Sequence, residues 1–563
     1  MFELQVANPV AANSAAPRVT PATRPDDLSG KTVGLFWNQK AGGDDALELV
    51  AEHIGEKFDN VTFRNFTVSV GSNIRNLTPS DRKTVVAQCD VVVGTTGDCG
   101  SCTSWLIRDM VNLEKAGIPT VSITASGFVH DANISAEVDG FPGLPLAIVE
   151  HNLTNHDREG VRNLVTPALD DIVEALTTQP KQPTTNLTEQ GALEFETYEA
   201  ADAVKAIDAF NAGFIEHEWS DGLPLVPATP GKLEEMLAGT PLSRETVIVD
   251  GLYPGLGVAT VEKIAINGIM AGCKPEHMPV LIAMVKAYEG TGYLGRTQAM
   301  STGPNAPLVM ISGPIIEELG FNNGSCVSGP GSPSHANSVI GRALRLILMN
   351  IGFAYPRVMD MDAIGTSNKY SWCLAENTEP QAWEPWNVAQ GFDEDASTVS
   401  IALCYPGPDI RQPAATTPEE FLDTIVSLTG HYHGVSSVGR WLYGGKKDPE
   451  TSKTLYEKHV LLLAPDHARM ISKAGWTPTE MAQYLYENSR MPFRKLYSGS
   501  FPDSKRAEKL MLARPELAWL LDQPDTLITM SESPECYQVF TTGGAGAKSQ
   551  FIYGGSEVST VAI

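Results

Sequence analysis

Two cysteines provide the clearest chemistry in the sequence. Cys99 and Cys102 stand between a short apolar run, Val91 to Val93, and a segment with helical character at 104–116. Free N–H groups at the start of a helix, together with the helix dipole, favour a thiolate over a thiol. Two thiols one helical turn apart also allow one to attack and the other to displace it as a disulfide. The spacing therefore predicts Cys99 as a nucleophile and Cys102 as its resolving partner.

Asp98 precedes the first cysteine, and we count it with the catalytic residues. A neighbouring carboxylate raises the pKa of a thiol, so Asp98 opposes the effect of the helix. A metal half-site is an alternative, although a structural zinc site needs four ligands and no second C-x-x-C is present. A lyase or hydrolase with Cys99 as a covalent nucleophile and no disulfide step, and a redox sensor without turnover, also stay open.

The elements around the cysteines alternate between strand and helix. Apolar runs predict strands at 32–37, 61–68, 90–94, 120–124 and 146–149, and amphipathic segments predict helices at 44–58, 80–86, 104–116 and 157–176. This alternation is typical of right-handed βαβ units around a parallel sheet. We expect a flavodoxin-like, doubly wound α/β domain over residues 31–178, with strand order 2-1-3-4-5.

A doubly wound sheet binds ligands at the carboxyl ends of its strands, where the winding reverses. Polar residues follow several of the predicted strands at that edge or lie in the cysteine turn. We expect these residues to bind the substrate: Asn38, Lys40, Ser101, Thr103, Ser126 and His151.

The rest of the chain divides by composition. Residues 1–30 predict an extended N-terminal arm, 179–195 a Pro/Thr-rich linker, and 196–563 a larger second α/β domain with Gly-rich loops. One such loop contains Cys326 and leads into a predicted helix at 337–350, a shape suited to anions. We expect the loop to close over the substrate, with help from Ser334, Asn337 and Arg342.

Composition narrows the class of partner. The 563 residues carry a formal net charge of −26, which disfavours nucleic acid and anionic membranes. No apolar run reaches the length of a membrane span, and residues 1–30 lack the basic start and apolar core of a secretory signal. Eight cysteines are too few for a disulfide scaffold in a chain of this size. We expect a cytoplasmic homo-oligomer that acts on a small molecule.

The cysteine turn also carries a family resemblance. Residues 97–105 (GDCGSCTSW), followed by 113–120 (LEKAGIPT), resemble the UGSC family of (seleno)proteins, named for a selenocysteine-Gly-Ser-Cys motif. The motif is distantly similar to the substrate-binding selenoprotein B of glycine and betaine reductases. The resemblance covers about residues 30 to 178 and implies that Cys99, at the selenocysteine position, is the attacking atom. The second half resembles an unassigned family that occurs with it.

Together these features predict a thiol-dependent oxidoreductase. In the reductases that the motif resembles, the chalcogen takes part in reductive cleavage of a carbon–nitrogen bond with partner proteins. We therefore expect reductive cleavage or transformation of a carbon–heteroatom bond in a small anionic organic substrate. An external thiol or a reductase protein would be the electron donor. No cofactor is required by this scheme, and a zinc or copper enzyme with the cysteine pair as ligands stays open.

Overall fold

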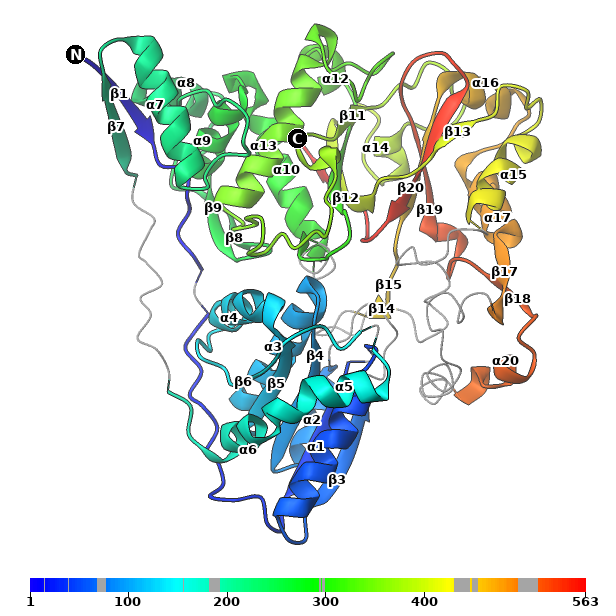
Figure 1. Ribbon diagram of the computed structural model, residues 1–563. Coiled ribbons are helices and arrows are strands. Elements are labelled where there is room, and N and C mark those ends of the chain that lie inside the picture. The colour runs from blue at the N-terminus through cyan, green and yellow to red at the C-terminus, as the bar shows by residue number, and fades with distance from the viewer. Residues whose placement is uncertain are drawn as a thin grey trace.

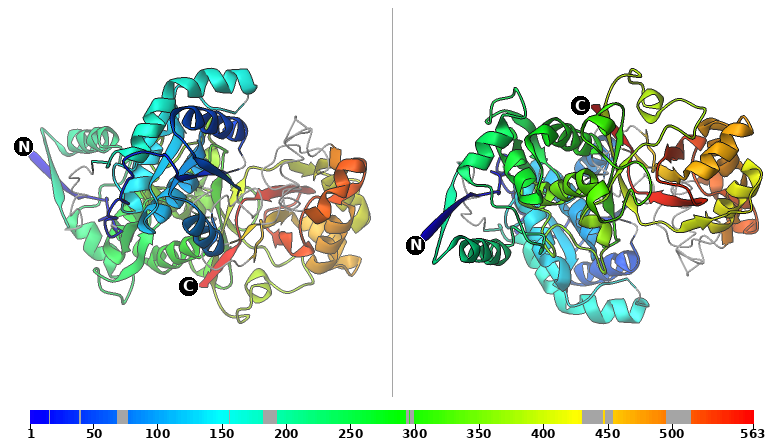
Figure 2. Two further views of the ribbon diagram at one scale, coloured as in Figure 1. Left: turned by 90° about the horizontal axis from the view of Figure 1, so that it is seen from below. Right: turned by 90° about the horizontal axis from the view of Figure 1, so that it is seen from above.

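The computed structural model describes residues 1–14, 16–38, 40–67, 77–154, 156–181, 193–292, 295, 299–429, 446–447, 454–494 and 515–563. The chain forms two domains (Figure 1), the first built mainly from residues 31–177 and the second from most of the remainder. The first domain lies against the part of the second that contains α9, α10 and α13 (Figure 2), and the C-terminal strands extend to one side.

The first domain is a five-stranded sheet with the order β3-β2-β4-β5-β6, and all its strand pairs are parallel. In chain order this is 2-1-3-4-5, so the flavodoxin-like prediction is confirmed. Its strands and helices are β2 (Thr32–Trp37), α1 (Gly43–Lys57), β3 (Thr62–Thr67), α2 (Pro79–Gln88), β4 (Val91–Gly97), α3 (Gly100–Lys115), β5 (Thr120–Ala125), α4 (Val129–Val138), β6 (Leu146–Val149), α5 (Arg158–Val165) and α6 (Leu169–Thr177).

Both faces of this sheet are covered by helices, which explains why its strands are nearly continuous apolar runs. Helices α1, α5 and α6 pack on one face, and α2, α3 and α4 pack on the other. Strand residues alternate between the two cores: Val91 and Val93 face the first, and Val92 faces the second. The sheet is therefore rigidly held, and its carboxyl edge places the residues that follow β2, β4 and β6 side by side.

Several predicted boundaries differ from the structure. Helix α3 begins at Gly100 rather than 104, because the cysteine turn itself supplies its first turn. Helix α4 was not predicted, since its buried side is made mainly of small residues such as Ala132 and Ala136. The helix predicted over 157–176 is interrupted by a 3-10 turn that contains Pro167.

The second domain is built around a mixed eight-stranded sheet with the path β11-β10-β12-β20-β16-β19, to which β13 and β21 add. Its amino-terminal elements are β1 (Phe2–Ala7), β7 (Phe195–Ala200), α7 (Ala203–Glu216), α8 (Pro230–Leu237), β8 (Val247–Leu252), β9 (Gly257–Thr260), α9 (Val261–Ala271), α10 (Met278–Gly290), β10 (Ala306–Ser312), α12 (Ile315–Glu318), α13 (His335–Asn350) and β11 (Cys373–Ala375).

The carboxyl-terminal part completes the sheet and adds a second group of helices. Its elements are α14 (Trp386–Ala389), β12 (Thr398–Tyr405), β13 (Asp409–Arg411), α15 (Pro418–Thr429), β14 (Lys446–Lys447), β15 (Thr454–Leu455), β16 (His459–Leu463), α16 (Pro465–Lys473), α17 (Pro478–Asn488), β17 (Arg490–Pro492), α20 (Trp519–Asp522), β18 (Leu527–Thr529), β19 (Tyr537–Thr541), β20 (Lys548–Gly554) and β21 (Ser559–Ala562). The prediction of a larger second α/β domain is confirmed.

The segment predicted as one N-terminal arm, 1–30, is divided between the domains. Residues 2–7 form β1, which pairs antiparallel with β7, and Ala11 donates a hydrogen bond to the carbonyl of Asn350. Further along, Arg24 makes a buried two-pronged ion pair with Glu114 of α3, with N···O distances of 2.7 and 2.8 Å. Residues 1–14 therefore belong to the second domain, and residues from Val19 to Leu28 pack against the first.

No helix within the described part of the chain has the length and apolarity needed to cross a membrane.

Candidate functional site

The thiol pair lies at the start of α3, on the carboxyl edge of the first sheet. Cys99 is the N-cap residue of α3, and its Sγ accepts a hydrogen bond from the backbone N–H of Cys102 at 3.3 Å. Ser, Asp or Asn usually fill this role, because an oxygen satisfies the free N–H groups of the first turn. Here sulfur does so, with the Ser101 hydroxyl 3.8 Å away. A thiolate fits this position better than a neutral thiol.

A lysine from the end of β2 joins the site. The Nζ of Lys40 lies 2.6 Å from Oδ1 of Asp98 and 3.4 Å from the Asp98 carbonyl. Asn38 is buried and positions it: its Oδ1 accepts from the Lys40 N–H at 3.3 Å, and its Nδ2 donates to the Thr96 carbonyl at 3.0 Å. The predicted convergence of residues after the first and third strands is therefore seen in the structure.

These contacts change the protonation of the thiol. The pKa of Cys99 is lowered most by the hydrogen bond from the Cys102 thiol, and burial of the sulfur raises it. The charge of Lys40 and the Cys102 N–H lower this pKa further, whereas the charge of Asp98 raises it. The result is a pKa of about 5, compared with an ordinary value of 9.0. Burial disfavours the charge of Lys40, but Cys102, Cys99 and Asp98 outweigh it and raise the pKa of Lys40. Thiolate and ammonium thus stabilise each other.

Two residues after β6 complete the surroundings of Asp98. Thr154 donates its hydroxyl to Asp98 Oδ2 at 2.7 Å, and Asn152 donates its amide to the Asp98 carbonyl at 3.1 Å. Neither was predicted. The available signal was position, because both follow the end of the fifth strand, where the sequence pointed instead to His151.

The other predicted rim residues lie farther out. Ser126 donates to the carbonyl of Glu150 at 2.5 Å, and the exposed His151 lies 4.0 Å from the Glu150 carboxylate. Both therefore belong to the outer rim of β5 and β6. Thr103 is buried in α3, and its N–H donates to the Cys99 carbonyl at 2.9 Å. Its hydroxyl has no hydrogen-bond partner within the described residues.

The second domain covers the first turn of α3. A Cβ atom built on Gly100 would lie 1.8 Å from the carbonyl oxygen of Met300 and 2.9 Å from the Cβ of Met361, so only glycine fits there. Met300 also packs with Met359 and with Val138 of α4 in a small apolar cluster between the domains. The thiol pair therefore lies at a domain interface that sequence reasoning did not specify residue by residue.

The Cys326 loop does not reach the thiols. It follows α12, which lies on the side of the second domain farthest from the first (Figure 1). Ser334 donates to the Cys326 carbonyl, and Asn337 bonds the backbone of residue 322, so these residues stabilise their own loop. Arg342 binds Asp221 through Nε at 2.7 Å. The contacts that these residues make are within the second domain, so closure of the loop over the substrate stays a prediction.

Comparison with known proteins adds one result. The profile of one family, described as the UGSC family, covers the thiol domain and most of the N-terminal arm. Residues 5–178 match the UGSC family. Neither the curated proteins nor the solved structures gave a match. The family resemblance inferred from the cysteine turn is thus confirmed, whereas the similarity to selenoprotein B stays a prediction.

In the UGSC region, the candidate centre consists of Cys99, Cys102, Lys40 and Asp98, supported by Asn38. Across the described part of the chain, no three or more His, Cys, Asp or Glu side chains gather in a way that could hold a metal ion. The arrangement can present a thiolate next to an ammonium group, with a second thiol within one helical turn.

Proposed function

We propose that this protein is a thiol-dependent oxidoreductase that reductively cleaves a carbon–heteroatom bond in a small anionic organic substrate. The observation that carries the proposal is the position of Cys99 as the N-cap of α3, with its sulfur accepting the N–H of Cys102. This position stabilises the attacking thiolate and keeps the resolving thiol next to it.

The chemistry balances with two thiols as the reductant. For a substrate R–X, the Cys99 thiolate attacks carbon and forms an S–R bond while X leaves with the electron pair and takes a proton. The Cys102 thiolate then attacks the Cys99 sulfur, and R leaves with its electron pair and takes the second proton. The products are RH, HX and a Cys99–Cys102 disulfide. A carbonyl or carboxylate next to the reacting carbon stabilises the departing pair, and a dithiol reductant or reductase restores both thiols.

Lys40 and Asp98 have distinct roles in this scheme. The ammonium of Lys40 supports the thiolate and attracts an anionic substrate. Asp98 acts as a positioning residue, because its carboxylate holds the ammonium at 2.6 Å while Thr154 fixes the other carboxylate oxygen. We further propose that the protein works in the cytoplasm, where thiol pools keep such a pair reduced.

The two cysteine variants separate the steps. Reduced protein is incubated with 2-halo and 2-amino carboxylates in the presence of a dithiol, and products are followed by NMR together with intact-protein mass. We expect the wild type to turn over, Cys99→Ser to be inactive, and Cys102→Ser to accumulate an R group on Cys99. Trapping occurs because the thioether then lacks the neighbouring Cys102 thiol that attacks the Cys99 sulfur and releases R.

The matched control is Cys89→Ser in the same domain. Cys89 is buried, and burial raises its pKa to about 11, so this variant should behave as the wild type. Turnover by Cys102→Ser without reductant would favour the non-redox nucleophile instead. A Cys99 that neither forms an adduct nor links to Cys102 after oxidation would contradict both versions.

A further inference from the structure

One residue of the second domain that contacts the start of α3 stands between two buried aspartates. A Cβ atom built on Gly100 would lie 2.9 Å from both the Cβ and the Cγ of Met361. Asp360 and Asp362 flank this methionine in the chain, and both carboxylates are paired with a cation. A residue that closes over the thiol helix is therefore fixed on both sides by charged neighbours.

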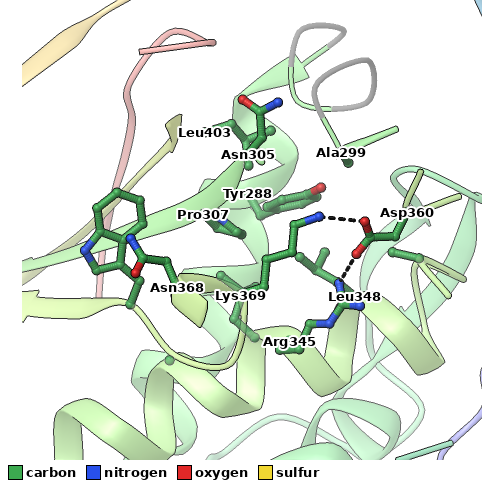
Figure 3. Close-up of a pocket in the computed structure, with 14 residues that line it drawn as sticks. Tyr288, Ala299, Asn305, Pro307, Arg345, Leu348, Asp360, Asn368, Lys369 and Leu403 are labelled. Carbon is green, nitrogen blue, oxygen red and sulfur yellow. Dashed lines mark hydrogen bonds and ion pairs between the residues drawn. The ribbon is translucent and has the colours of Figure 1, made fainter. Parts of the chain in front are cut away.

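Lys369 joins the two aspartates. Its Nζ lies 2.6 Å from Oδ1 of Asp360 and 2.6 Å from Oδ2 of Asp362. Arg345 of α13 pairs with the other oxygen of Asp360 at 2.9 Å, and Figure 3 shows both pairs of this aspartate. None of the four side chains is more than 15% exposed. Two positive charges thus balance two negative ones in a largely buried group, which we call the Lys369 cluster: Arg345, Asp360, Asp362 and Lys369.

The same cluster anchors the other segment that closes over α3. The N–H of Ala363 donates to the carbonyl of Thr302 at 2.9 Å. Two residues before Thr302, the carbonyl oxygen of Met300 would lie 1.8 Å from a Cβ atom on Gly100. Residues 357–366 are all described and form no helix or strand, so side-chain pairs and single hydrogen bonds set the path of this stretch. Both segments that cover α3 therefore depend on the Lys369 cluster.

Burial makes the charges of this cluster depend on one another. Taking a charge out of water is costly unless a partner compensates it, and removal of one partner leaves the other charge buried and unpaired. Without Lys369, Asp362 would lose the cation at 2.6 Å, and Asp360 would keep only Arg345. The carboxylate of Asp362 would then be more stable in water, and its outward movement would carry Met361 away from α3.

We propose that Lys369 is a positioning residue that holds Met361 and Met300 on the first turn of α3 and thereby excludes bulky molecules from Cys99. Release of the Lys369 cluster opens the thiol centre to a protein reductant. The importance of this step for turnover rests on the proposed function, since only a disulfide at the thiol centre needs a reductant. The positioning itself is independent of that chemistry.

Labelling of Cys99 by two maleimides of different size tests the proposal without turnover. The reduced full chain reacts with N-ethylmaleimide or with a bulky dye maleimide, and peptide mass spectrometry gives both rates at Cys99, which is partly exposed in the closed arrangement. The ratio of the bulky to the small rate cancels the thiolate fraction. Lys369→Met should raise this ratio roughly tenfold or more, because an unpaired buried charge strongly destabilises the closed arrangement. Lys369→Arg keeps the charge and should restore the wild-type ratio.

The pH profile of the wild type gives a second readout. Burial raises the pKa of Asp362 to about 6; Lys369 and Arg345 offset part of this rise, and Asp360 adds to it. Protonation removes the charge that pairs with Lys369, so the labelling ratio should rise as pH falls from about 7.5 to about 5.5. Asp362→Asn lacks this charge throughout and should show the higher ratio at both pH values.

Arg244→Met is the matched control, because Arg244 also joins two carboxylates, those of Glu234 on α8 and Glu262 on α9. Its ratio should equal that of the wild type, and circular dichroism with thermal unfolding confirms that each variant folds. A wild-type ratio in folded Lys369→Met, an equal rise in Arg244→Met, or a wild-type ratio that does not change with pH would each overturn the proposal. A raised ratio in Lys369→Met without any turnover by the wild type would refute the proposed function and leave the positioning role intact.

Discussion

Replacing Lys40 by methionine tests the electrostatic basis of the thiol centre. The pKa of Cys99 falls from 9.0 to about 5 in the folded protein, which corresponds to a preference for the thiolate of about 5 kcal/mol. An opposite charge within a few ångströms typically accounts for about one to three pH units of such an effect. Lys40→Met should therefore raise the pKa of Cys99 to between about 6 and 8. The freed carboxylate of Asp98 acts in the same direction.

The assay is the rate of alkylation of Cys99 by iodoacetamide between pH 4 and 9, followed by peptide mass spectrometry. If the pKa rises to about 7, the thiolate fraction at pH 6 falls from about nine-tenths to about one-tenth, and alkylation slows roughly tenfold. Asp98→Asn removes a negative charge and should shift the profile to lower pH. The two variants therefore move the profile in opposite directions.

Lys57→Met serves as the control, since Lys57 pairs with Asp170 on the exposed side of the same domain. Its alkylation profile should match that of the wild type. If Lys40→Met left the profile of Cys99 where it was, hydrogen bonding alone would account for the low pKa, and the role given to Lys40 would be wrong.

Three further predictions concern the stability of the fold and the closure of the domain interface. Because the pKa of Cys99 is depressed in the folded protein, its thiolate stabilises the fold fully above pH 9, and this stabilisation is lost as pH falls through 5. Cys99→Ser should therefore lower the free energy of unfolding by about 3 kcal/mol at pH 7 and leave it unchanged at pH 4. Urea denaturation at the two pH values measures the difference. Arg24→Met leaves a buried carboxylate unpaired and should cost about 3–5 kcal/mol in the same assay. Gly100→Ala meets the Met300 carbonyl and should separate the domains, detected as faster labelling of Cys99 by a bulky maleimide. A Cβ on Gly55 would make only an ordinary contact with the ring of Phe63, at 3.7 Å, so Gly55→Ala should not affect labelling. Unchanged labelling in Gly100→Ala would argue against a closed interface.

The first domain could be predicted from the sequence because its signals are local. Each strand of the parallel sheet is a short apolar run between helices, and the strand order then follows from the handedness of βαβ units. The same rule brought Asn38, Lys40, Asp98 and the cysteines to one edge of the sheet. The sequence placed the start of α3 four residues too late, because Gly100 and its polar neighbours are weak helix formers. For the same reason the sequence did not identify Cys99 as the residue that caps this helix.

The remaining parts of the site depend on contacts between distant segments. Arg342 looked available to an anion because its partner, Asp221, lies 121 residues earlier in the chain. Met300 and Met361 cover α3 through backbone and side-chain contacts that no spacing in the sequence encodes. Asn152 and Thr154 bind Asp98 from the segment that follows β6, 54 and 56 residues later in the chain. Local patterns therefore specified the sheet edge, but not what covers it.

The pairing of β1 with β7 has a consequence for how the two domains move. The chain leaves the two-stranded ladder after Ala7 and returns to it at Phe195, and these two residues are direct partners in the ladder. The first domain is thus inserted between two hydrogen-bonded strands and tethered at both of its ends. Any opening that admits a bulky reductant to Cys99 therefore has to occur while both covalent connections to the second domain are kept. A single backbone cleavage in either connection would leave the domains covalently joined through the other.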